Sequence, residues 1–365
     1  MTPPTFIPGL ELGRLYYTEA IRPILDASYP DLPHDAALIG SGSDKLGFDT
    51  PMSRDHDWGP SCILFVRESD LHIKLEIEHT LSLQLPRTLH GYTTHFDESP
   101  LEAGTMVMTD PVEGPIKHRV TVTTVRAFVQ QHLGYDLNIP IQPADWLTFP
   151  SQRLRTLTAG AIYHEGIGHV RALREKFAWY PHDVWLYLLA SGWTRIAQEE
   201  HLMPRAGYVD DPLGSALIGS RLVRDIITLC FLMEKQYAPY PKWFGTAFKQ
   251  LHSYPILQPI LWRAQIAQNW QERESALVEA YAYIAQAHNA LGITDPLPEE
   301  PTQFFNRPFK VIWGERFADA IAARITDPEV IRIASRRMIG SIDQFSDSTD
   351  LREDSTRRAE LRNLY

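Results

Sequence analysis

The chain has 365 residues, of which 44% are hydrophobic and 22% are charged, and this balance excludes a disordered chain. Its 35 basic and 45 acidic residues give a net charge of −10, which argues against broad, non-specific binding to nucleic acid. This length is sufficient for two domains, each with a substantial buried core.

The first part of the chain, from about Gly9 to Gly134, mixes helix and strand patterns. The predicted boundaries of these elements rest on three patterns: apolar residues at helical spacing, runs of β-branched residues, and Gly134 as the end of a helix. In residues 70–85, alternating apolar residues leave a strand open beside the favoured helix. The predicted elements are, in chain order, a helix over 9–28, a buried strand over 36–39, a strand over 56–66, a helix over 70–85, a strand over 119–125 and a helix over 126–133.

Strand patterns nearly vanish after Tyr135, and long helical patterns separated by proline and glycine clusters follow. These patterns cover residues 168–179, 182–202, 214–236, 243–251 and 264–291, and a charged tail spans 343–365. We therefore predict an α+β fold in which a small mixed sheet with helices precedes an all-α helical bundle. The predicted domains are 1–135, 136–300 and a C-terminal helical extension over 301–365.

The apolar runs around Cys62 and Cys230 predict two buried thiols rather than a metal or redox pair. Residues 1–8 lack the pattern of a secretory signal, and no apolar stretch approaches the roughly 18 residues of a membrane span. A cytoplasmic protein without a membrane partner is the expectation.

A glycine-serine turn and a pair of acids carry the clearest chemistry. Gly40-Ser41 follows the predicted strand 36–39, and Asp55-His56-Asp57 opens the next predicted strand after residues 42–54. Alternation along a strand would place both carboxylates on one side, roughly 7 Å apart at about 3.3 Å per residue. Magnesium is typically held by one or two carboxylates and substrate phosphates, and glycine lets the main chain approach a phosphate. The alternative is a glycine-rich surface turn before a solvated strand.

The pattern Ile39-Gly40-Ser41 followed by Asp55-His56-Asp57 resembles the polymerase-beta-like nucleotidyltransferase superfamily, at the upper end of that family's spacing. Residues 53–60, 237–248, 288–289, 307–309 and 340–345 also resemble an uncharacterised bacterial family, similar to antibiotic nucleotidyltransferases and catalogued as a domain of unknown function. This resemblance covers most of the chain. It implies a catalytic α/β domain, a helical domain, and a homodimer of the kind that relatives with this architecture often form.

The reaction that the resemblance implies is the magnesium-dependent transfer of a nucleoside monophosphate from ATP, or another nucleoside triphosphate, to a hydroxyl of a small molecule. The acceptor would bind in the cleft between the domains. Asp55 and Asp57 would be the catalytic metal ligands. Residues implied or considered for binding the nucleotide are Gly40, Ser41, Ser43, Arg54 and Lys242.

For two of these residues other interpretations stay open. Arg54 either contacts phosphate or pairs with Asp55, and Lys242 either reaches the triphosphate or flanks a packed tryptophan. Arg221 and Arg224 fall on one predicted helix with Asp225, where an internal ion-pair network is favoured over phosphate contact.

One departure from the superfamily concerns a third carboxylate, which usually lies on a later strand. The predicted strand 119–125 (RVTVTTV) has none. The candidates elsewhere are Glu165, Glu199, Glu200 and Asp225, each more often a surface or ion-paired acid. The alternatives are that two carboxylates suffice or that catalysis is lost.

Two rival functions remain on this evidence: nucleotidylation of a protein or an RNA end, as in antitoxin-type enzymes, and a non-catalytic nucleotide sensor. A zinc protease is rejected. His164 and His169 are five residues apart, whereas the zinc helix needs histidines at i and i+4, so the segment between them is interpreted as a turn between helices.

Overall fold

The computed structural model describes residues 4–110 and 113–365. The chain packs into two compact units. The first comprises the residues up to Pro140 together with Arg153–Ala178, and the second comprises Ile141–Gln152 and Trp179–Tyr365. Whether the segments 1–135, 136–300 and 301–365 fold as separate domains stays a prediction. The α+β class itself is confirmed, because a small mixed sheet near the N-terminus precedes many helices.

A four-stranded mixed sheet with the order β7-β2-β1-β8 forms the centre of the first unit. Strand β1 pairs antiparallel with β2 and with β8, whereas β2 and β7 run parallel. The strands are β1 (Asp35–Leu38), β2 (Ser61–Phe65), β7 (Arg119–Thr123) and β8 (Ala161–Glu165). Two short hairpins pair β3 (Thr88–Leu89) with β4 (Tyr92–Thr93) and β5 (Phe96–Glu98) with β6 (Met106–Met108).

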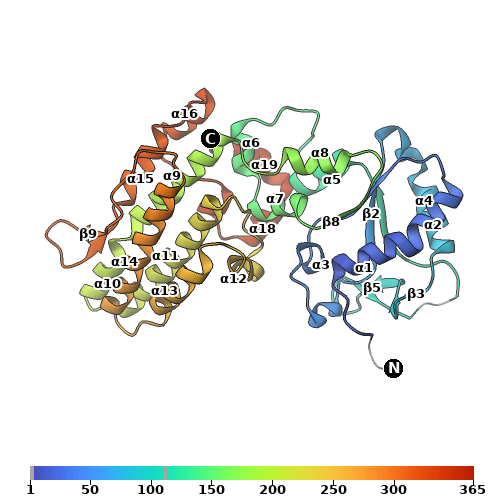
Figure 1. Cartoon of the computed structure of the whole chain (residues 1–365), viewed down its shortest axis with the longest axis horizontal. Coiled ribbons are helices and arrows are strands. Elements are labelled where there is room, and N and C mark those ends of the chain that lie inside the picture. Colours follow the sequence, from blue (N-terminus) through green and yellow to red (C-terminus); the bar gives the residue numbers. More distant parts are fainter. Residues whose placement is uncertain (1–3, 111–112) are drawn as a thin grey trace. The chain divides into compact units, whose positions relative to one another are not determined.

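Helices cover both faces of this sheet, with α2 and α4 on one side of β2 and α5 and α8 on the other (Figure 1). Alternation along β2 explains the two layers: Cys62 and Leu64 join the core beneath the first helices, and the Phe65 ring contacts Phe128 of α5 at 5.4 Å. The helices are α1 (Gly9–Leu15), α2 (Arg22–Ser28), α3 (Ser43–Leu46), α4 (Lys74–Gln84), α5 (Val125–Leu133), α7 (Ser151–Thr158) and α8 (His169–Lys176). A π-helix (Tyr16–Ile21) joins α1 to α2, and 3-10 turns cover Pro51–Asp55 and Glu68–Ile73.

The helix predicted over residues 126–133 is confirmed as α5, and its local sequence explains where it begins and ends. The Thr124 side chain accepts a hydrogen bond from the main-chain N–H of Ala127 at 3.2 Å, which caps the first turn. Gly134 ends the helix in the left-handed conformation, with φ of +61°, which glycine adopts at little cost.

Two expectations about strands are wrong. The strand predicted over residues 56–66 begins only at Ser61, because residues 51–55 form a 3-10 turn that starts at Pro51. Strand β8, in the region predicted to be helical, was missed, and it contains His164 and Glu165. The residues between His164 and His169 therefore connect an edge strand to α8 and not two helices. Pairing with β1 stabilises this short strand, whose sequence by itself did not indicate an extended conformation.

The second unit is built from helices that pack side by side, with α9 against α11 and α15, and α13 against α14. Its core holds Trp193, which is fully buried and stacks on Phe317 with ring centroids 4.1 Å apart. The long helices are α9 (His182–Glu199), α11 (Pro212–Met233), α13 (Tyr254–Ile266) and α14 (Trp270–Ala290).

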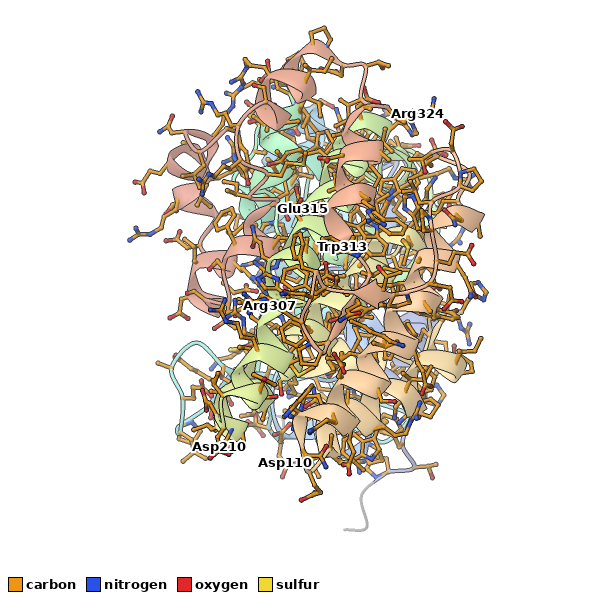
Figure 2. All side chains as sticks on the ribbon, turned by 90° about the vertical axis from the view of Figure 1, so that its left-hand side faces the viewer. Asp110, Asp210, Arg307, Trp313, Glu315 and Arg324 are labelled. Carbon is orange, nitrogen blue, oxygen red and sulfur yellow. The ribbon has the colours of Figure 1, made fainter. Side chains whose placement is uncertain are left out.

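The remaining elements of this unit are short. The helices are α6 (Pro143–Thr148), α10 (Leu202–Tyr208), α12 (Phe244–Phe248), α15 (Gly314–Ala322), α16 (Pro328–Ala334), α17 (Ile342–Phe345), α18 (Thr349–Glu353) and α19 (Arg358–Arg362). A hairpin joins β9 (Thr302–Gln303) to β10 (Lys310–Val311), and 3-10 turns cover Pro241–Trp243 and Ser355–Arg357. Figure 2 shows Trp313 and Glu315 where α15 begins and Arg324 beyond its end.

Candidate functional site

The sheet register brings the glycine-serine turn and the segment that leads into β2 to one edge. In the antiparallel pairing of β1 with β2, Ala37 lies opposite Ile63, so the end of β1 and the beginning of β2 meet at the same edge. Strand β7 starts there too, because Arg119 lies opposite Ser61 in the parallel pair. Residues directly after β1, directly before β2 and at the start of β7 therefore share this edge.

The turn after β1 requires glycine at two positions. Gly40 and Gly42 have φ angles of +113° and +133°, which side-chain-bearing residues rarely adopt. The main-chain N–H of Gly40 donates to the carbonyl of Thr156 at 3.0 Å, which fixes the turn to α7. Ser41 is exposed at its tip, and Ser43 is half-buried at the first position of α3. The turn thus presents small residues and a hydroxyl at the edge of the sheet.

A lysine and a histidine that the sequence did not single out lie beside this turn. The Lys45 ammonium is 3.1 Å from the nearer carboxylate oxygen of Asp44, and only 12% of its side chain is exposed. A Cβ atom on Gly40 would lie 3.4 Å from Nε2 of His132 on α5. Burial lowers the pKa of His132 to about 4, and the charge of Lys45 acts in the same direction, so this imidazole is neutral at pH 7.

Asp55 and Asp57 lie on the bend before β2 and not on the strand itself. Asp55 ends the 3-10 turn, has a side chain that is 61% exposed, and has Oδ2 3.0 Å from Nδ1 of His56. Asp57 has φ of +48° and a side chain that is 47% exposed. Its Oδ1 accepts a hydrogen bond from the N–H of Met106 at 3.2 Å. The strand-alternation argument for placing both carboxylates on one side is therefore wrong, although both remain accessible.

Arg119 stands at the start of β7, a strand without any carboxylate. Its Nη2 is 3.6 Å from Oδ1 of Asp57, and its guanidinium lies 5.4 Å from the centre of the Phe96 ring. Within residues 4–110 and 113–365, no group of three or more histidine, cysteine or acidic side chains could hold a metal ion. Asp55 and Asp57 supply accessible oxygen atoms of the kind that magnesium prefers, and their role as magnesium ligands stays a prediction.

The two other predicted binding residues lie in different surroundings. Arg54 donates from Nε to the carbonyl of Pro51 at 3.1 Å and from Nη1 to that of Pro4 at 3.2 Å. Lys242 is exposed in the second unit, with Nζ 5.3 Å from the centre of the Trp243 ring. Their roles in nucleotide binding stay predictions.

The candidates for a third carboxylate all have structural partners. Glu165 pairs with Arg171, Glu199 with Arg221, and Asp225 with Arg195 at 3.2 Å. Glu200 accepts hydrogen bonds from the main-chain N–H groups of Ile312 at 2.6 Å and Gly314 at 3.1 Å. These contacts join β8 to α8 in the first unit, and they join α9 to α11 and to the chain at the start of α15 in the second unit. The ion pairs expected around Arg221 and Asp225 are confirmed.

Comparisons with known proteins add family-level information. Residues 146–244 match the family described as Domain of unknown function (DUF4037). The chain is also similar to a nucleotidyltransferase-like protein from Exiguobacterium sibiricum 255-15, at 9% identity and a TM-score of 0.33, over 95% of this chain and 88% of that one. At that TM-score the likeness supports no assignment of activity.

No curated protein matches the chain. Among the described helices, none has the length and apolarity required to cross a membrane.

Proposed function

We propose that the chain is a metal-dependent nucleotidyltransferase that moves a nucleoside monophosphate from a triphosphate, ATP in the first instance, to a hydroxyl of a small molecule. The observation that carries this proposal is the shared sheet edge. The antiparallel pairing of β1 with β2 brings the turn at Gly40 to the same edge as the segment before β2, which carries Asp55 and Asp57, although 13 residues (42–54) separate Ser41 from Asp55.

Each group at the edge has a role in this proposal. Gly40 and Gly42 let the main chain approach the outer phosphates, Ser41 offers a hydroxyl, and Lys45 adds a positive charge next to the turn. Asp55 and Asp57 would hold magnesium, which when bound neutralises charge on the α-phosphoryl group and orients the leaving group.

The reaction balances without an oxidant or reductant. The acceptor oxygen forms a bond to the α-phosphorus, the bond from that phosphorus to the bridging oxygen breaks, and pyrophosphate leaves. The hydroxyl proton passes to solvent. Arg119 adjoins Asp57 on β7, a strand without the carboxylate that the polymerase-beta-like superfamily usually carries on a later strand, and this favours a second candidate function, a sensor that binds nucleotide without turnover.

The test is calorimetric titration of ATP, GTP, CTP and UTP with magnesium into wild type and into Asp55→Asn/Asp57→Asn. We expect magnesium-dependent binding of one nucleotide, weakened at least about tenfold in the double variant because charge-assisted contacts are lost. Asp26→Asn is the matched control, since its side chain is 65% exposed on α2 and pairs with Arg22 at 3.5 Å.

Pyrophosphate release separates the two candidate functions. Release with an acceptor present supports the transferase, and binding without release across an acceptor screen supports the sensor. Absence of binding for all four nucleotides to folded wild type, or equal binding to the double variant, would overturn both.

A further inference from the structure

A cavity of about 440 Å³ lies within the second unit, lined entirely by residues of that unit. Three aromatic rings form much of its wall. Trp179 and Tyr237 have ring centroids 4.8 Å apart, and Tyr180 meets Tyr237 edge-on at 5.1 Å. Aromatic walls with a few polar groups are typical of small-molecule sites, and flat rings suit such walls best.

The charged side chains at one part of this cavity differ in how far they are exposed. Arg352 is only 8% exposed and donates from Nη2 to the main-chain carbonyls of Asp343, at 3.1 Å, and Ser346. Asp347 is 74% exposed, pairs with Arg224, whose side chain is 39% exposed, and has Oδ1 3.8 Å from Nη2 of Arg352. An exposed ion pair contributes little stability, so the anion of a ligand can replace Asp347 on Arg224, whereas Arg352 is fixed.

The acid that is fixed at the cavity is already neutralised. Oδ2 of Asp343 accepts a hydrogen bond from the N–H of Ser151 at 2.7 Å, and its Oδ1 lies 3.7 Å from Nε of Arg352. By contrast, Arg224 is an accessible cation of the cavity wall, whereas Nε of Arg352 and Nε1 of Trp179 are buried atoms that a ligand in the cavity does not reach. An accessible guanidinium in the wall favours a ligand that brings anionic oxygens over one that brings a cation.

We propose that this cavity binds a planar aromatic molecule carrying one anionic group, a carboxylate or a phosphate. The ring packs against Trp179 and Tyr180, and the anionic group binds Arg224 in place of Asp347. All residues that line this cavity belong to the second unit, and none of them is among the residues given a role at the Gly40 turn.

The first experiment compares probes that share an aromatic ring but differ in charge. Indole-3-acetate, indole and tryptamine are titrated calorimetrically into Asp55→Asn/Asp57→Asn, which lacks the proposed nucleotide site. We expect saturable binding of indole-3-acetate that is at least about tenfold tighter than binding of indole or tryptamine, as for a charge-assisted contact. AMP in the same background tests the phosphate source, and whichever of AMP and indole-3-acetate binds more tightly identifies the anion.

The second experiment assigns the binding to the cavity. Arg224→Gln should weaken binding of the preferred anion about tenfold. The control is Arg221→Gln on the same helix, because Arg221 pairs with Glu199 and does not line the cavity. Circular dichroism confirms that each variant is folded. The proposal is overturned if tryptamine binds as tightly as indole-3-acetate, if neither anion binds, or if both arginine variants behave alike.

Discussion

The candidate catalytic acids of the two units are held in contrasting ways. In the first unit Asp55 and Asp57 lie on a bend with 61% and 47% of their side chains exposed. In the second unit Asp225 and Glu199 are 8% and 11% exposed and are paired with arginines. Exposed acids can take up a cation and a phosphate, whereas neutralised acids cannot. The comparison therefore teaches that ligand recognition in the second unit falls to the aromatic wall of its cavity and to Arg224, whose acid partner Asp347 is exposed.

The largest effect that we expect outside the two sites concerns the core of the second unit. Trp193→Ala removes a fully buried ring that stacks on Phe317 and should lower the free energy of unfolding by about 3–5 kcal/mol. Urea unfolding followed by circular dichroism measures this loss. Magnesium-dependent nucleotide binding under native conditions should persist, since the binding residues at the Gly40 turn belong to the first unit.

Trp262→Ala is the matched control, because Trp262 lies on α13 and is 58% exposed. Its replacement should change the free energy of unfolding by no more than about 0.5 kcal/mol. Equal losses in the two variants would contradict the core position of Trp193, and loss of nucleotide binding in folded Trp193→Ala would break the comparison between the units.

We expect an effect of intermediate size on the free energy of unfolding when the pH changes, because of the buried acid Glu200. Burial raises the pKa of Glu200 to about 7, although main-chain N–H groups of Gly314, Ile312 and Trp313 oppose this shift. The folded state therefore holds a proton that the unfolded state, with a pKa near 4.5, has released. This contribution to stability is complete below pH 4.5 and is lost as pH rises through 7, by about 1.4 kcal/mol per pH unit at the steepest point.

Urea unfolding of wild type and Glu200→Gln between pH 4.5 and pH 8 measures this dependence. The difference between the two free energies of unfolding should change with pH in the stated direction, because glutamine does not titrate. Glu360→Gln is the control, since Glu360 is 77% exposed on α19. A difference that stays constant across this pH range would contradict the raised pKa of Glu200.

The smallest effect distinguishes two glycines. Gly40→Ala places a side chain at φ of +113° and 3.4 Å from Nε2 of His132, so it should cost about 1–2 kcal/mol of unfolding free energy. Gly245→Ala, in α12, meets no atom within 4 Å and should stabilise the protein by up to about 1 kcal/mol. Thermal unfolding of both variants measures the sign of each change, and a loss of the same size at both positions would contradict the strained turn at Gly40.

Much of the fold follows from local sequence. The helix at α5 was predicted because its apolar spacing and the glycine that ends it are local signals, and β7 was predicted from its run of β-branched residues. Cys62 and Cys230 are buried free thiols, as their apolar neighbours predicted. The Gly40-Ser41 turn and the nearby acids could likewise be selected from the sequence, because residue type and spacing are properties of the chain itself.

Tertiary structure decided the rest. Strand β8 exists through its pairing with β1, so its position is not written in a local pattern. Lys45, His132 and Arg119 come to the sheet edge from three different elements, and the aromatic cavity gathers rings and charges from segments as distant as Ser151 and Arg352. Sequence determined which groups are available for chemistry, and packing between distant segments determined which of them meet, because contact energies depend on distance in space and not along the chain.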